Sequence, residues 1–469
     1  MKYHPTLLLL PLGLLLASAS LASAQNTTAP GAAPATPPAF WSWAPTPPMG
    51  WNSYDAWGDT VTEDQVLANA QYMHDHLLSH GWNIIVIDFR WYDPQPTGND
   101  RLLNRTRTGA VLTADASGRL LPAPNRFPTT ADGAGFKPLD DKIHALGLKF
   151  GLHLMRGIPR QAVLANTPIA GSNFTAADAA DPADKCPWCP DMFGVRNNPA
   201  GQAWYNAEFK LLASWGLDFV KVDDLSVPYH ADEVLMIRHA LDQSGRPIIF
   251  STSPGPTQLQ YAAQLKMNAN QWRISGDFWD QWKKLDHQFD LFAQWSVANA
   301  TGPGHYPDGD MIPFGRIAIK SAMGGRDHLT HFTPDEQLTL LSLWSLESSP
   351  LMLGLNLPDT DDATNTLLTN DEVLRIDQDP LCSPAQRVSQ KDGLEIWVKT
   401  LHDGAKAIGL FNRTNTPANL TLNFPDAQLS GNQTLRDVWN HRDLGVFSQT
   451  FTAPVPPHGV VFVRSSSQP

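Results

Sequence analysis

The sequence predicts an α/β protein, in which a (β/α)8 TIM barrel is followed by a C-terminal antiparallel β-sandwich domain. Eight strand-like runs alternate with helix-like segments over roughly 300 residues, which is typical of a barrel. From about Lys391 the pattern changes to short alternating strands such as LEIWVKTL and ANLTLNF, separated by turn residues. Such strands are typical of a small sandwich.

The barrel prediction rests on eight candidate strands and on the helices between them. The predicted strands are residues 49–54, 83–89, 149–154, 218–224, 247–253, 271–277, 304–312 and 349–357. TEDQVLANAQYMHDHLLSHG follows the first strand as a helix, with Thr62 as its N-cap and acids in its first turn. A doubly wound sheet is the alternative, but no glycine-rich phosphate turn follows the first strand.

The N-terminal segment has the pattern of a secretory signal peptide. Lys2 and His4 precede the apolar run LLLLPLGLLLA, and Ala22-Ser23-Ala24 provides a small-x-small cleavage site. We expect a signal peptide over residues 1–24, a disordered lead-in over 25–40, the barrel over 41–385 and the sandwich over 386–469. The expected protein is secreted or periplasmic. No later apolar run approaches the ~18 residues of a membrane span, so we expect no membrane partner.

Composition excludes some partners and leaves others open. The 469 residues carry a net charge of −12, which argues against nucleic acid or an anionic membrane as a partner. The 16 tryptophans fit an uncharged substrate such as an oligosaccharide or polysaccharide, although Trp is also a common core residue. The oligomeric state stays open.

Three cysteines are too few for a disulfide scaffold. Cys186 and Cys189 lie in KCPWCP, which is compatible with a redox pair, half a zinc site or a loop disulfide. No second CxxC or HxxxH completes a zinc site, so we expect no metal and favour the disulfide. Cys382 remains as a free buried thiol.

Polar residues end most of the predicted barrel strands. The carboxyl ends of barrel strands form one rim, where catalytic groups gather. The groups at these ends are Trp51, Asn52, Asp88, His153, Asp223, Asp224, Ser251, Asp277, Asp308 and Asp310. A salt-bridge network with Arg90, Arg156, Lys221 and Arg273 is the alternative explanation for so many acids. Because four strands bring acids to the functional face, we favour a catalytic role.

Two carboxylates that face one another across a pocket can hydrolyse a glycosidic bond. Asp223 suits the nucleophile, because Lys221 lies on the same face of its strand and favours the ionised form. Asp277 follows an apolar stretch in WRISGDFWDQW, and an apolar surrounding would keep it protonated as the acid catalyst.

These motifs resemble those of the family 27 glycoside hydrolases, which include the secreted α-galactosidases. PPMGWNSYDAWG is similar to the family's opening strand, FVKVDD to its fourth strand, and WRISGD to its Arg-x-x-x-Asp signature. GPGHYPDGDM and LLTNDEVLRIDQDPL resemble later family segments, so the likeness runs from about Pro47 to Val463. The resemblance implies that Asp223 is the nucleophile and Asp277 the acid/base. It also implies double displacement with retention of configuration and no metal or cofactor.

The sequence departs from the family pattern where substrate is recognised. The family usually carries two consecutive aspartates after its second strand, where this chain has Asp88 followed by Phe89 and Arg90. The third strand leads to GLHLMRGIPR instead of a tyrosine-containing loop closed by a cysteine, and Leu225 replaces the usual cysteine after the nucleophile. A missing partner for a sugar hydroxyl changes which sugar is accepted.

We therefore predict a secreted retaining glycoside hydrolase, with α-galactosidase as the first choice. The alternatives are the same mechanism on a β-L-arabinopyranoside or an isomaltose-type α-glucoside, or a non-catalytic carbohydrate-binding barrel. The predicted substrate-binding residues are Trp51, Asp88, Arg90, His153, Arg156, Lys221, Asp224, Arg273 and Asp310. For Arg90, His153 and Arg156 a structural role at the rim is the alternative. Asp224 either contacts substrate or balances Lys221.

Overall fold

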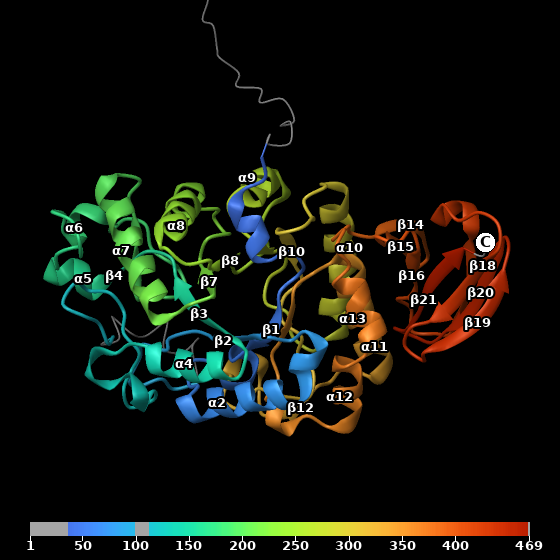
Figure 1. Cartoon of the computed structure of the whole chain (residues 1–469), viewed down its shortest axis with the longest axis horizontal. Coiled ribbons are helices and arrows are strands. Elements are labelled where there is room, and N and C mark those ends of the chain that lie inside the picture. The colour runs from blue at the N-terminus through green and yellow to red at the C-terminus, as the bar shows by residue number, and fades with distance from the viewer. Residues whose placement is uncertain (1–35, 99–111, 468–469) are drawn as a thin grey trace, which may run out of the picture. The chain divides into compact units, whose positions relative to one another are not determined.

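The computed structural model describes residues 36–98 and 112–467 and has the predicted fold (Figure 1). The eight barrel strands are β1 (Met49–Asn52), β2 (Ile84–Ile87), β3 (Lys149–Met155), β7 (Phe219–Asp223), β8 (Ile249–Thr252), β9 (Gln271–Arg273), β10 (Tyr306–Asp308) and β13 (Leu351–Leu353). Each lies within, or within one residue of, a predicted run. The predicted signal peptide and most of the lead-in fall outside the described residues.

The barrel strands form one parallel sheet in the order β10-β9-β8-β7-β3-β2-β1-β13. The two edges meet beyond the end of β10. There Ile312 N–H donates to the Met352 carbonyl at 2.7 Å, and Gly354 N–H donates to the Ile312 carbonyl at 3.0 Å. Neighbouring strands pack closely at Gly50, where a Cβ atom would lie 2.5 Å from the Ile84 carbonyl oxygen. The barrel is therefore closed by a single parallel bridge.

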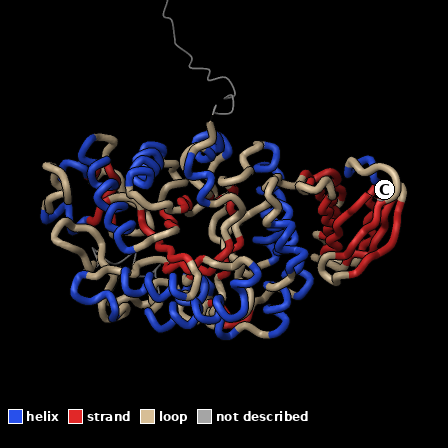
Figure 2. The backbone as a smooth tube through the Cα atoms, viewed as in Figure 1, coloured by secondary structure: helices blue, strands red, loops and turns tan. Residues whose placement is uncertain are grey.

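Helices surround the barrel strands (Figure 2). They are α1 (Tyr54–Trp57), α2 (Glu63–Tyr72), α4 (Lys137–Ala145), α5 (Arg160–Ala165), α6 (Ala176–Ala179), α7 (Pro199–Trp215), α8 (Ala231–Gln243), α9 (Ala262–Lys266), α10 (Trp282–Val297), α11 (Pro334–Glu347), α12 (Asp362–Leu368) and α13 (Asp371–Asp377). Thr62 is the N-cap of α2 as predicted, and its N–H donates to Gln65 Oε1 at 2.9 Å. Asn198 caps α7 by accepting the Gly201 N–H.

Short strands decorate the loops. A three-stranded sheet contains β4 (Ile158–Pro159), β5 (Ala180–Asp181) and β6 (Met192–Val195), and a hairpin pairs β11 (Arg316–Ile317) with β12 (His328–Leu329).

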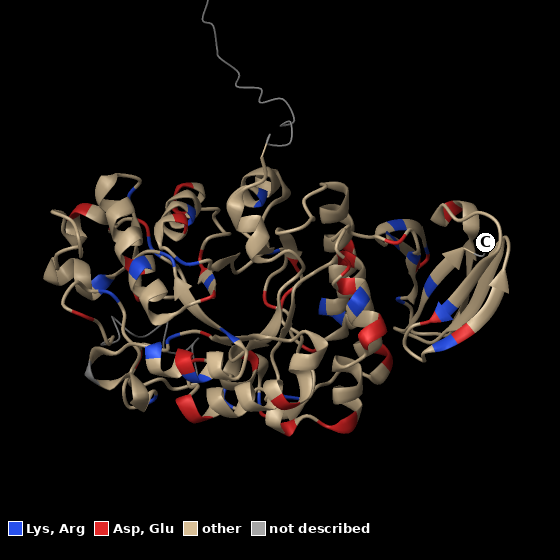
Figure 3. Ribbon diagram, viewed as in Figure 1, with Lys and Arg blue, Asp and Glu red and all other residues tan. Residues whose placement is uncertain are grey.

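No helix in the described part of the chain is both long and apolar enough to cross a membrane. Figure 3 shows acidic and basic residues interspersed over the described elements rather than gathered into one basic face.

The C-terminal strands form the predicted antiparallel sandwich. They are β14 (Gln386–Lys391), β15 (Leu394–Thr400), β16 (Lys406–Asn412), β17 (Ala418–Asn423), β18 (Gln433–Asp437), β19 (Arg442–Phe447), β20 (Thr450–Val455) and β21 (Val460–Ser467). Six of them make one sheet in the order β14-β15-β16-β21-β18-β19, and β17 pairs with β20. Apolar side chains such as Leu410, Leu422 and Phe451 fill the space between the two sheets. The sandwich contacts α10 and α11 of the barrel.

Candidate active site

A cavity of about 360 Å³ opens at the carboxyl ends of the barrel strands, within the size range of small-molecule sites. Its lining contains six of the predicted site residues, namely Asp88, Lys221, Asp223, Arg273, Asp277 and Asp310. The other lining residues are Tyr54, Asp55, Phe89, Trp188, Ser253, Pro254, Gly255, Gly276, Phe278, Trp279, Met311 and Met323. The parallel sheet thus brings together acids that lie more than 200 residues apart in sequence.

Asp223 is the last residue of β7, and its carboxylate is mostly buried. His153 on the neighbouring strand β3 places Nε2 3.1 Å from Asp223 Oδ2. Burial alone would raise the pKa of Asp223, but the Lys221 ammonium and His153 hold this pKa well below its usual range. Asp223 is therefore ionised at neutral pH, as a nucleophile requires.

Asp88 follows β2, and its carboxylate accepts three hydrogen bonds, one of them from the Phe89 N–H to Oδ1 at 2.8 Å. Asn52 Nδ2 donates to Asp88 Oδ2 at 2.6 Å, and Lys221 Nζ donates to the same oxygen at 3.0 Å. Burial opposes ionisation of Asp88, but Lys221 and His153 lower its pKa overall. Lys221 therefore stabilises the negative charges of both Asp88 and Asp223. Burial lowers the pKa of Lys221, but these two carboxylates raise it overall.

Arg273 at the end of β9 connects Asp310 and Asp277. Its guanidinium lies 2.6 Å from Asp310 Oδ2 and 3.5 Å from Asp277 Oδ1. Burial raises the pKa of Asp310 to about 7 even though Arg273 opposes the shift. The Asp277 side chain is 50% exposed, so the predicted apolar enclosure of this carboxyl is wrong. The segment extends Asp277 into the cavity instead of burying it.

One side of the cavity is aromatic. The Phe89 ring lies edge-on to His153 at 5.5 Å between centroids, and it contacts Trp188 at 6.1 Å and Tyr54 at 6.5 Å. Phe89 occupies the position where the resembling family carries its second aspartate. This part of the lining consequently offers an apolar surface in place of a carboxylate.

Asp55 is an acid of the lining that sequence reasoning missed. It lies in α1, three residues after β1, and is only 1% exposed. Its Oδ2 is buried with no hydrogen-bond partner among the described residues, and it fits beside Gly354, where a Cβ would collide with it. Burial raises the pKa of Asp55 well above its usual value, and Asp310 adds to the shift. The only sequence signal was its place in the loop after the first strand.

Five predicted substrate-binding residues do not belong to the cavity lining. They are Trp51, Arg90, His153, Arg156 and Asp224. His153 still contacts Asp223, as described above. Trp51 is fully buried inside the barrel, where its Nε1 donates to the Leu355 carbonyl at 2.6 Å.

The two arginines among these residues form ion pairs with buried carboxylates outside the cavity lining. Arg90 Nε donates to Asp191 Oδ2 at 2.8 Å with both side chains buried. Arg156 lies 3.0 Å from Asp224 and 2.7 Å from Glu233. Asp224 therefore pairs with Arg156, whereas the sequence had left open a contact with substrate or with Lys221. Both pairs are buried and lie outside the cavity lining.

The predicted disulfide is also corrected, because Cys186 and Cys189 are buried free thiols. Burial raises the pKa of both thiols. Arg90 Nη2 lies 3.9 Å from Cys189 Sγ. The CPWC loop places Trp188 in the cavity lining while the two thiols lie beneath it.

Three groups of histidine and carboxylate side chains in the described ranges have the proximity of metal ligands, and none contains a lining residue. They are Asp280-His328-His331, Asp140-His144-Asp218 and Asp184-His230-Glu233. In the first group His328 Nε2 and His331 Nδ1 each lie 2.9 Å from Asp280 Oδ2, and the two imidazole rings stack at 4.2 Å between centroids. Arg156 occupies the third group by pairing with Asp184 and Glu233.

Comparison with known proteins places this geometry in a family. Residues 193–379 match the family model described as alpha galactosidase A, and residues 391–465 match that of the alpha galactosidase C-terminal beta sandwich domain. The α-galactosidase of Cyamopsis tetragonoloba is 28% identical over 88% of this chain and 84% of its own length.

Solved structures are more similar. The family 27 β-L-arabinopyranosidase of Geobacillus stearothermophilus is 42% identical, with a TM-score of 0.86 over 91% of this chain and 98% of that one. A variant of that enzyme in complex with arabinose gives a TM-score of 0.88 over 92% and 99%. A Bacillus halodurans structure described as an α-N-acetylgalactosaminidase is 41% identical, with a TM-score of 0.80 over 90% and 97%. The chain belongs to the family 27 glycoside hydrolases.

Proposed function

We propose that the enzyme removes terminal β-L-arabinopyranosyl residues from oligosaccharides or other glycosides. The observation that carries this proposal is Phe89, which lines the cavity directly after Asp88. The resembling α-galactosidases place a second aspartate there to hold a galactose hydroxyl. An aromatic ring cannot accept that hydrogen bond, and an unpaired buried hydroxyl costs about 1–3 kcal/mol.

β-L-Arabinopyranose fits such a cavity for a chemical reason. It has the same spatial arrangement of oxygen substituents as α-D-galactopyranose at C1 to C4, but its C5 carries no exocyclic hydroxymethyl group. A galactoside in this cavity would have one more polar group to satisfy, beside a wall formed by Phe89, Trp188 and Tyr54. The 42% identity to a β-L-arabinopyranosidase supports the same choice.

The proposed reaction is double displacement with retention of configuration. The Asp223 carboxylate attacks the anomeric carbon while the Asp277 carboxylic acid protonates the departing oxygen, which leaves a glycosyl ester on Asp223. Asp277 then removes a proton from water, and the water oxygen attacks the same carbon and releases Asp223. Asp88 and Arg273 line the same cavity and can hydrogen-bond sugar hydroxyls. We further propose export of the enzyme, on the basis of the N-terminal sequence pattern.

The second candidate is α-galactosidase activity. The matched family models are described in terms of α-galactosidase, and curated relatives of that activity align over most of the chain. Asp88 remains available for one galactose hydroxyl. Both activities use the same two carboxylates and differ only in the sugar.

Hydrolysis of four p-nitrophenyl glycosides tests the proposal, with kcat/KM measured for each. The sugars are β-L-arabinopyranose, α-D-galactose, α-D-glucose and α-N-acetyl-D-galactosamine. We expect the arabinopyranoside to exceed the galactoside by about 10-fold or more, which is the effect of one unpaired hydroxyl. A higher kcat/KM for the galactoside would establish the second candidate. Activity on none of the four would contradict both.

A further inference from the structure

The segment that carries Asp277 leads directly into α10, and two hydrogen bonds join this segment to the start of the helix. Lys284 Nζ in the first turn of α10 donates to the Asp277 backbone carbonyl at 2.8 Å. Gln281 N–H, immediately before the helix, donates to the Trp279 carbonyl at 2.7 Å. Asp277 is half exposed, and among the described residues its side chain has only the 3.5 Å contact with Arg273, so the position of its carboxyl depends on this backbone. The start of α10 therefore helps to fix the backbone at Asp277, together with the Phe278 N–H, which donates to Asp310 Oδ2 at 2.8 Å.

The sandwich holds the start of α10 through an aromatic stack. The indole of Trp282, the first residue of α10, lies parallel to the His458 imidazole, with 3.8 Å between centroids and 7° between planes. His458 belongs to the turn between β20 and β21. Its Nδ1 lies 2.7 Å from Glu336 Oε1 of α11, and its Nε2 lies 2.9 Å from Asn415 Oδ1. Hydrogen bonds at both ring nitrogens thus hold the imidazole in the orientation in which it stacks on Trp282.

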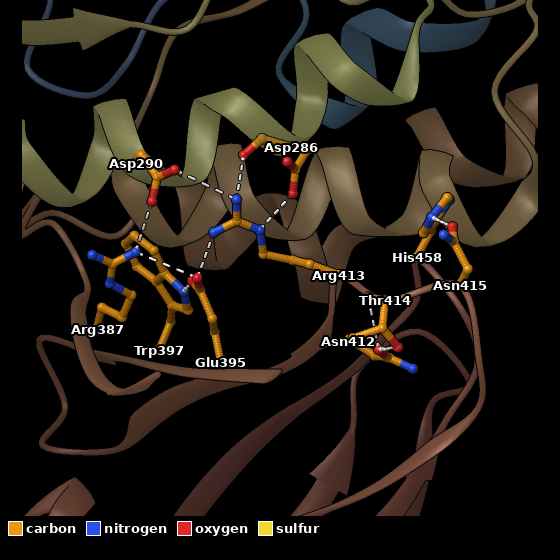
Figure 4. A network of polar contacts seen from close by, with 10 residues as sticks. All are labelled: Asp286, Asp290, Arg387, Glu395, Trp397, Asn412, Arg413, Thr414, Asn415 and His458. Atoms are coloured by element: carbon orange, nitrogen blue, oxygen red, sulfur yellow. Dashed lines mark hydrogen bonds and ion pairs between the residues drawn. The ribbon is translucent and has the colours of Figure 1, made fainter. Parts of the chain in front are cut away.

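A second contact holds the next turn of the helix (Figure 4). Arg413 of the sandwich donates from Nε to Asp286 Oδ1 at 2.6 Å and from Nη2 to the Asp286 carbonyl at 3.0 Å. Its Nη1 donates to Glu395 Oε1 at 2.5 Å, and the Glu395 side chain is fully buried. Arg387 joins Glu395 to Asp290, one turn further along α10. Because the Arg413 guanidinium binds both the side chain and the backbone carbonyl of Asp286, it neutralises the carboxylate and also holds the helix in position.

We propose that the C-terminal sandwich positions the acid/base residue Asp277 through His458 and Arg413. This inference rests on the proposed function, in which Asp277 protonates the departing oxygen. His458 and Arg413 are positioning residues, since neither lines the cavity. A displacement of about 1 Å in a reacting group can cost on the order of 100-fold in rate. Loss of either contact should therefore impair proton donation more than nucleophilic attack by Asp223.

Two leaving groups on the same sugar separate these effects. The alcohol of an alkyl glycoside departs only when Asp277 protonates its oxygen. The 2,4-dinitrophenolate of a dinitrophenyl glycoside departs as a stable anion without that proton. In the full-length His458→Ala and Arg413→Ala variants we expect kcat/KM for the alkyl glycoside to fall about 10- to 100-fold. For the dinitrophenyl glycoside we expect less than about a 3-fold change. His458→Phe keeps a ring on Trp282 and should restore most of the lost activity.

The matched control is Arg436→Ala, because Arg436 also joins the sandwich to the barrel but contacts Glu372 on α13, at 2.8 Å. It should affect neither substrate. Arg413→Lys provides a milder change if Arg413→Ala does not fold. Equal losses on both substrates, or no loss on either, would overturn the inference. A wild-type enzyme that hydrolyses neither glycoside would instead overturn the proposed function, and this inference with it.

Discussion

Lys221 Nζ lies 3.0 Å from Asp88 Oδ2, so the strand that ends in Asp223 also binds the acid at the end of β2. The two strands are not neighbours, because β3 lies between them in the sheet. The lysine therefore reaches across the rim between two cavity acids. Burial of this cation is tolerated because carboxylates surround it.

Replacement of Lys221 should change the pH dependence of hydrolysis. Because Lys221 lowers the pKa of Asp223, its removal in Lys221→Met should raise that pKa and leave less of the nucleophile ionised in mild acid. We expect the acidic limb of kcat/KM to move to higher pH, together with a drop of about 100-fold or more near neutrality. Lys221→Arg keeps the charge and should keep the limb nearer its original place. An unshifted limb in Lys221→Met would show that the lysine does not act on Asp223.

Phe89 should determine the choice of sugar. Phe89→Asp restores the second carboxylate of the resembling α-galactosidases and provides a partner for a galactose hydroxyl. We expect the ratio of galactosidase to arabinopyranosidase kcat/KM to rise by about 10- to 100-fold. Phe89→Leu, which stays apolar, should leave the ratio near that of the wild type. Equal ratios in Phe89→Asp and Phe89→Leu would mean that specificity is set elsewhere in the cavity.

Asp55 should act as a neutral hydrogen-bonding group. Its pKa is raised well above the usual value, so the carboxyl is protonated over a wider pH range than an exposed acid. The isosteric amide in Asp55→Asn should retain kcat/KM within about 10-fold, whereas Asp55→Ala leaves a buried cavity and should lose about 100-fold. Steady-state kinetics on the preferred glycoside provides the comparison. An Asp55→Asn enzyme as impaired as Asp55→Ala would indicate that the ionised form is needed.

Glu208 in α7 should weaken the fold as pH rises. Burial raises the pKa of Glu208 to about 8, and its Oε2 has no hydrogen-bond partner within the described chain. Between pH 4.5 and 8 the folded state therefore binds more protons than the unfolded state, so the free energy of unfolding falls as pH increases. Glu208→Gln should match the wild type at pH 5 and be more stable at pH 9, by several kcal/mol at most. Urea unfolding at the two pH values measures the difference, and the same pH dependence in both proteins would refute the assignment.

The sequence was sufficient to predict the order of the elements, because strand periodicity and strand-end acids are local signals. All eight barrel strands and the sandwich lie where the pattern indicates them. The pairing of charges could not be predicted in this way. Arg156 and Asp224 lie 68 residues apart and meet because β3 and β7 pair as neighbouring parallel strands, so a sequence pattern cannot show that they satisfy each other. Asp55 was missed because it lies in a loop helix and not at a strand end.

The central claim is that Asp223 forms a covalent glycosyl intermediate. A 5-fluoro-glycosyl fluoride of the preferred sugar slows hydrolysis of that intermediate and allows the enzyme to be trapped, digested and analysed by mass spectrometry. We predict a single label on the peptide that contains Asp223, with no label on Asp223→Asn. A label on another carboxylate, or continued substrate turnover by Asp223→Asn, would contradict the account.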